Sequence, residues 1–110
     1  MKIEATQNGT QVILKVSGRM DAANATLFQE ECESGIKRGA TVLILDFSEL
    51  TYISSMGLRA LVVVGKFLEE RNGKLHICGL TGLVKQVFEI TRLNSVFTIH
   101  DSVQSALAAV

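Results

Sequence analysis

The chain has 110 residues, of which 47% are hydrophobic and 20% are charged, and its eleven basic and eleven acidic side chains cancel. This composition predicts a single folded domain over residues 1–110 and excludes a disordered chain. Without a basic block or interleaved aromatic and basic residues, nucleic-acid binding is not expected. The apolar runs are too short to span a bilayer and no secretory signal is evident, so we expect a cytoplasmic protein with no direct membrane insertion.

The first half of the chain predicts a hairpin, a helix and a buried strand. Asn8-Gly9 lies between "KIEAT" and "QVILKVSG" and is typical of a tight hairpin turn. Asp21 is a good N-cap for the helix that follows, whose apolar residues recur at spacings of three and four. "TVLILDF" is short, β-branched and apolar, which favours a strand buried on both faces. We expect the chain to leave this strand over residues 47–51.

The second half alternates between helices and strands. A helix is expected from about Met56 to Arg71, followed by the strand "KLHICGL", the helix "GLVKQVFEITRL", the edge strand "VFTIH" and a last helix capped by Asp101. The order β-β-α-β-α-β-α-β-α predicts an α/β fold. We expect a mixed, mostly parallel sheet of about four to five strands with about four helices.

Catalytic and cofactor motifs are absent from the sequence. His76 and His100 have no Cys, Asp or Glu at metal-ligand spacing, and no glycine-rich phosphate or dinucleotide loop occurs, so no metal or cofactor is expected. A triad of Ser55, a histidine and Asp46 can be written on paper. However, "YISSMGL" is not a nucleophile elbow, so enzyme activity is the weaker hypothesis. Cys32 and Cys78 are expected to be buried free thiols.

Two adjacent serines, Ser54 and Ser55, stand between the predicted strand and the helix from Met56. A hydroxyl at this junction can accept a hydrogen bond from an unpaired amide, but capping explains only one of the two serines well. The helix dipole would favour a phosphate there by ~0.3–1 kcal/mol. Phosphorylation would add about −1.5 to −2 charges to the surface. The junction therefore permits a switch that expels a bound partner while the fold persists.

Three segments together resemble the STAS domains, specifically the stand-alone bacterial anti-sigma factor antagonists. "LILDFSELTYISSMGLRAL" is similar to the central motif of that family, and "VSGRMDAANA" is similar to its first motif. "GKLHICGLTGLVKQVFEITRLNSVFTIHDSVQSAL" is similar to its closing strand, helix, short strand and final helix. The resemblance covers essentially the whole chain.

The resemblance implies a partner-switching role without catalysis. The unphosphorylated protein would bind an anti-sigma factor that is also a serine kinase, and so free the client of that factor. The kinase would use ATP to phosphorylate Ser55, which ends binding, and a serine phosphatase would reset the cycle. Ser54, where the family most often has Asp, is the less favoured acceptor, and Met56 replaces the usual Ser, Thr or Ala.

The expected partner surface comprises Asp21, Asn24, Ser54, Ser55, Met56, Gly57, Leu58 and Arg59. Some of these residues also have a purely structural interpretation: Asp21 as an N-cap, Leu58 as core, and Gly57 as a site of close packing. An alternative function keeps the fold. In it, the chain is a non-phosphorylated STAS subunit that binds the ATPase of a membrane lipid transporter. The absence of the usual Asp at position 54 is compatible with this alternative.

Overall fold

The computed structural model describes residues 1–110 and contains five strands, four α-helices and one 3-10 helix in the predicted order. The elements are β1 (Lys2–Asn8), β2 (Gln11–Met20), α1 (Ala22–Lys37), β3 (Val42–Ile53), α2 (Ser55–Glu69), β4 (Lys74–Cys78), α3 (Gly82–Ile90), η1 (Leu93–Ser95), β5 (Thr98–His100) and α4 (Val103–Ala109). The predicted α/β class and element order are confirmed. None of the helices combines the length and the apolar character needed to cross a membrane.

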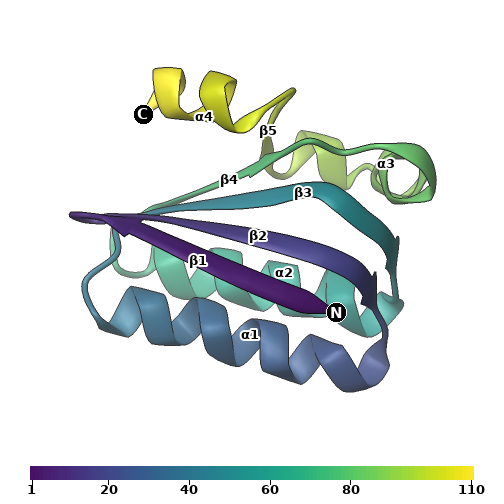
Figure 1. The fold of residues 1–110 in the computed structure, drawn as a ribbon, viewed down its shortest axis with the longest axis horizontal. Helices are drawn as coiled ribbons and strands as arrows, with labels where there is room; N and C mark the ends of the chain where they lie inside the picture. The colour runs from purple at the N-terminus through teal and green to yellow at the C-terminus, as the bar shows by residue number, and fades with distance from the viewer.

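The strands form one sheet in the spatial order β1-β2-β3-β4-β5, which is also their order along the chain. β1 is antiparallel to β2, and the three remaining pairs are parallel. Helices α1 and α2 cover one face of the sheet, whereas α4 lies on the other face (Figure 1). Both α1 and α2 therefore begin at the carboxyl ends of neighbouring parallel strands, β2 and β3.

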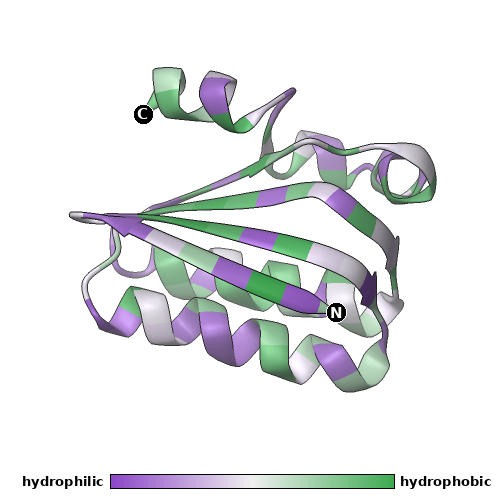
Figure 2. Cartoon of the chain, in the orientation of Figure 1, coloured by the Kyte–Doolittle hydropathy of each residue, from purple (hydrophilic) through white to green (hydrophobic).

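Most of the hydrophobic core lies between the sheet and the helices α1 and α2. This main cluster contains 21 buried residues, and the central strands and α2 are visibly more hydrophobic than α1 (Figure 2). A second, small cluster of Ile44, Cys78 and Ala106 lies on the opposite face, beneath α4. Side chains alternate across a strand, so β3 supplies both clusters, with Leu43 and Leu45 on one side and Ile44 on the other. Both cysteines are buried and free, as predicted.

Two local expectations were wrong. The chain does not leave the sheet after Phe47: β3 continues to Ile53, paired with β2 through two shifts of register. These irregularities let Leu50 and Ile53 stay buried while Ser48 and Glu49 face solvent. The last helix is capped by Ser102 rather than Asp101, because the Ser102 hydroxyl accepts a hydrogen bond from the Ser105 amide at 3.1 Å.

Candidate functional site at two helix starts

Ser54 is the N-cap of α2 and has a structural task. Its backbone is extended, and its hydroxyl accepts a hydrogen bond from the Gly57 amide at 3.1 Å. Its own amide donates to the Met20 carbonyl at the end of β2, at 2.9 Å. Ser54 is half-buried. The start of α2 is thus fixed both to its own first turn and to the neighbouring strand.

Ser55 is the first residue of α2 and is exposed. Its hydroxyl takes no part in the cap, because Ser54 already fills that position. The next residue, Met56, is 46% exposed, which is unusual for a large apolar side chain. Ser55 therefore presents a free hydroxyl beside an apolar side chain that solvent can reach.

The start of α1 lies next to the start of α2, because Met20 and Ile53 are register partners at the ends of β2 and β3. Asp21 caps α1 by accepting a hydrogen bond from the Asn24 amide at 2.9 Å. The Asn24 side chain donates to the Arg19 carbonyl at 3.0 Å. Asp21 is exposed and Asn24 half-buried. Both residues thus stabilise the turn from β2 into α1, and Asp21 also remains accessible.

Gly57 and Leu58 are less exposed than Ser55 and Met56 and contribute mainly to packing at the start of α2. Gly57 is buried, and a Cβ at this position would approach Ile53 Cγ1 to 2.8 Å and Met20 Sδ to 2.9 Å. Leu58 is half-buried and packs against the main cluster. Arg59, one position further along, is exposed. Gly57 therefore allows α2 to begin in close contact with the ends of β2 and β3.

Arg19 and Tyr52 form a contact that was not predicted from the sequence. They are register partners on β2 and β3, and the Arg19 guanidinium lies 4.2 Å from the centre of the Tyr52 ring. No local motif could have indicated this pair, since it depends on the extension of β3. We define the helix-start surface as the exposed side chains of Arg19, Asp21, Ser55, Met56 and Arg59.

The groups required for a serine hydrolase are not assembled around Ser55. His76 and His100 contact each other, with Nδ1 of His76 2.9 Å from Nε2 of His100, on strands β4 and β5. Asp46 accepts a hydrogen bond from the Ser48 amide at 3.0 Å. No group of three or more His, Cys, Asp or Glu side chains is arranged to hold a metal ion.

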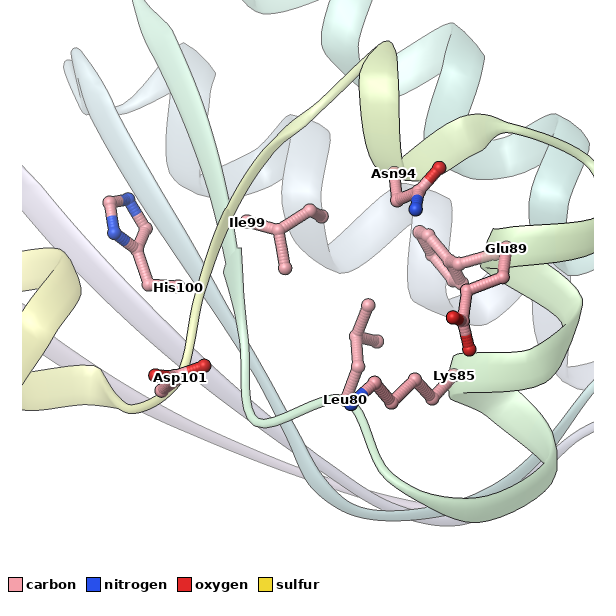
Figure 3. A pocket seen from close by; sticks show the side chains of 8 residues that line it. Leu80, Lys85, Glu89, Asn94, Ile99, His100 and Asp101 are labelled. Carbon is pink, nitrogen blue, oxygen red and sulfur yellow. The ribbon is translucent and has the colours of Figure 1, made fainter.

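A pocket of about 300 Å³ lies between β5 and α3, away from the helix-start surface. Ile99 and Leu80 extend into it, and Lys85 and Glu89 of α3 border it (Figure 3). None of its lining residues belongs to the helix-start surface. The pocket is therefore separate from the candidate site.

The elements form a small α/β domain with one mixed sheet. The STAS domain model matches residues 2–106, so the chain belongs to the STAS domain family. It is 34% identical over 109 residues to BtrV of Bordetella bronchiseptica, described as a candidate anti-sigma factor antagonist, covering 99% of this chain and 94% of that protein. It is 32% identical over 102 residues to the anti-sigma-B factor antagonist of Listeria monocytogenes, covering 92% and 90%.

The fold also matches solved structures. One is the Bacillus cell fate determinant SpoIIAA in its phosphorylated form, with a TM-score of 0.76 at 17% identity and coverage of 98% of both chains. At this identity the match supports the shared fold alone. The two relatives in these comparisons are named as anti-sigma factor antagonists.

Proposed function

We propose that this protein is an anti-sigma factor antagonist whose binding is controlled by phosphorylation of Ser55. The proposal rests on the different roles of the two serines at the start of α2. Ser54 forms the cap, and the exposed Ser55 hydroxyl is free to react. The relatives named as anti-sigma factor antagonists, including the one from Listeria monocytogenes, support the class of partner. SpoIIAA, which shares this fold, is known in a phosphorylated form, so the fold is compatible with phosphorylation.

A phosphate on Ser55 is compatible with the fold. The Ser54–Gly57 hydrogen bond that fixes the first turn does not involve the Ser55 hydroxyl. The positive end of the helix dipole favours an anion there by ~0.3–1 kcal/mol. The added group meets solvent rather than the core, because Ser55 is exposed.

The same phosphate opposes binding of a partner over the helix-start surface. It adds about −1.5 to −2 charges next to Met56, whose exposed apolar side chain is suited to a buried contact. A partner that covers Met56 would have to strip water from the phosphate, which costs several kcal/mol unless new partners compensate. Binding is therefore lost while the domain stays folded.

The proposed cycle has two enzymes outside this chain. The unphosphorylated protein binds an anti-sigma factor with serine kinase activity, and this association frees the client. The kinase transfers the γ-phosphate of ATP to the Ser55 oxygen, with loss of the hydroxyl proton and formation of ADP. A serine phosphatase hydrolyses the phosphoester and restores the binding form.

The experiment combines phosphorylation with binding. The protein is incubated with ATP and a kinase encoded near its gene, and the modified residue is located by mass spectrometry. We expect phosphate on Ser55 in the wild type and in Ser54→Ala, and none in Ser55→Ala. Ser55→Ala should keep its affinity for the kinase, whereas Ser55→Asp should bind poorly with an unchanged circular dichroism spectrum.

Gln104→Glu supplies a matched control for the added charge. Gln104 is an exposed residue in the first turn of α4, on the other face of the sheet. The Gln104→Glu variant should bind the kinase with the affinity of the wild type. Labelling of Ser55→Ala as strong as that of the wild type would contradict the choice of Ser55. Stable binding to a transporter ATPase that neither Ser55→Ala nor Ser55→Asp affects would support the alternative of a transporter subunit.

A further inference from the structure

Two histidines form a close pair on the sheet face opposite α1 and α2. His76 on β4 is the register partner of Ile44, and His100 on β5 is the register partner of Cys78. Ile44 and Cys78 belong to the small cluster beneath α4, so both histidines face this side. Figure 3 shows His100 projecting from β5 on the side opposite Ile99. The pair therefore lies where the β5–α4 segment meets the rest of the sheet.

The contact in this pair is close and largely shielded from water. Nδ1 of His76 is 2.9 Å from Nε2 of His100, and the ring centroids are 5.1 Å apart. His76 is only 6% exposed, and its Nε2 atom has no hydrogen-bond partner. At 2.9 Å one facing nitrogen donates a proton and the other must accept it. The contact cannot form when both facing nitrogens carry a proton.

The surroundings offer little compensation for a second positive charge. Burial, with contributions from the neighbouring His100 and from Lys74 on the same strand, lowers the pKa of His76 below 6.5. Asp46 of β3 faces this side but pairs with Cys78, two residues beyond His76, and Asp101 after β5 is exposed. Helix α4, with the sequence VQSALAA, has no titratable side chain. No carboxylate of α4 can therefore neutralise a charged His76.

We propose that the His76–His100 pair is a proton-sensitive latch that holds the β5–α4 segment, residues 98–109, against the sheet. Double protonation would place two N–H groups and two positive charges face to face, and separating β5 and α4 from β4 relieves this repulsion. The remaining attachment consists of three register pairs between β4 and β5, the partly buried Ile99, and Ala106, the one fully buried residue of α4. A short helix with so little buried surface opens at low cost.

The sign of the pH dependence follows from the lowered pKa. In the opened state, His76 returns to an ordinary pKa of about 6.5, so below that pH the opened state binds more protons than the docked state. Docking is therefore fully stabilised above about pH 6.5 and is weakened as the pH falls from there towards the lower pKa of the docked state. Uptake of one proton on opening raises the opening constant by up to about tenfold per pH unit. Opening uncovers the Cys78 thiol.

The two cysteines provide the test and its internal reference. Cys78 lies in the small cluster beneath α4, whereas Cys32 is on the buried face of α1, in the main cluster. Each thiol is measured alone, in the Cys32→Ser and Cys78→Ser variants, by its reaction with 4,4′-dithiodipyridine from about pH 7.5 to about pH 5.5. The ratio of the Cys78 rate to the Cys32 rate cancels the pH dependence of the reagent. We expect this ratio to rise by up to about tenfold between about pH 6.5 and pH 5.5.

Replacing His76 should abolish the rise, and replacing His100 should make it smaller, because burial of His76 contributes most to its lowered pKa and His100 contributes less. His100→Gln is the decisive variant, because His100 is half-buried on a three-residue edge strand and its replacement perturbs the core little. His76→Phe tests the other histidine of the pair. A constant ratio in the otherwise wild-type background would overturn the proposal, as would a rise of unchanged size in His100→Gln. The result does not depend on Ser55, so it is independent of the proposed partner switch.

Discussion

Replacing Ser54 by alanine should destabilise the domain, whereas the same change at Ser55 should not. Ser54→Ala removes the hydroxyl that accepts the hydrogen bond from the Gly57 amide at 3.1 Å. Loss of such an N-cap costs about 1 kcal/mol, within a range of ~0.5–2 kcal/mol. Ser55→Ala removes an exposed hydroxyl outside the cap, and its effect should stay within about 0.5 kcal/mol.

A third variant separates the cap from the chemistry of serine. Ser54→Asp keeps an oxygen that can accept the hydrogen bond from Gly57, and it adds a negative charge at the positive end of the α2 dipole. Its stability should equal or exceed that of the wild type. The three variants are compared by urea unfolding followed by circular dichroism at one temperature, with the slope of free energy against urea checked for constancy.

The expected order of stabilities among the variants depends on which of the two hydroxyls forms the cap. Ser54→Ala should lower the melting temperature by about 4 °C for a domain of this size, while Ser55→Ala and Ser54→Asp remain near or above the wild type. If Ser55→Ala were as destabilising as Ser54→Ala, Ser55 would be part of the cap. Its hydroxyl would then not be free for modification.

Three further predictions follow from packing, capping and burial. Gly73→Ala should lose ~1–3 kcal/mol of stability, as measured by urea unfolding, because its Cβ would overlap Leu68 Cδ1 and lie 2.8 Å from the Thr41 carbonyl oxygen; a neutral result would refute this close packing. Asp21→Ala should cost about 1 kcal/mol through loss of the α1 cap, while Asp21→Asn, which retains a capping oxygen, should cost much less; equal losses would exclude capping as the cause. Burial raises the pKa of Cys78 to about 11, so iodoacetamide at about pH 8 should label the folded Cys32→Ser variant roughly 100-fold more slowly than the same variant in urea; equal rates would show that the thiol is not shielded.

The helices, the hairpin and the element order could be predicted because their signals are local. Asn8-Gly9 indicates the hairpin between β1 and β2, although Asn8 pairs with Gln11 and the two turn residues are Gly9 and Thr10. The spacing of Phe28, Cys32 and Ile36 indicates the buried face of α1. The extension of β3 could not be predicted in this way. Ser48 and Glu49 have the polarity of a loop, and only pairing with β2 through shifts of register keeps this segment in the sheet.

The candidate site could be predicted in part, because some of its signals are local in the sequence. Two serines before an apolar helix indicate a capped helix start, but the sequence does not show which hydroxyl forms the cap. That depends on the backbone of Ser54 and its bond to the end of β2. The Arg19–Tyr52 contact and the pair of histidines depend on which strands are neighbours and on their register, so no local pattern reveals them.

The measurement that tests the central claim most directly is the affinity of the kinase partner for two forms of this chain, with serine or with genetically encoded phosphoserine at position 55. Isothermal titration calorimetry gives both dissociation constants, and thermal unfolding of each form reports the integrity of the domain. We expect the phosphorylated form to bind at least about 30-fold more weakly, the effect of ~2 kcal/mol or more, with an unchanged or slightly raised melting temperature. Equal affinities for the two forms, or a phosphorylated form that is unfolded, would contradict the account.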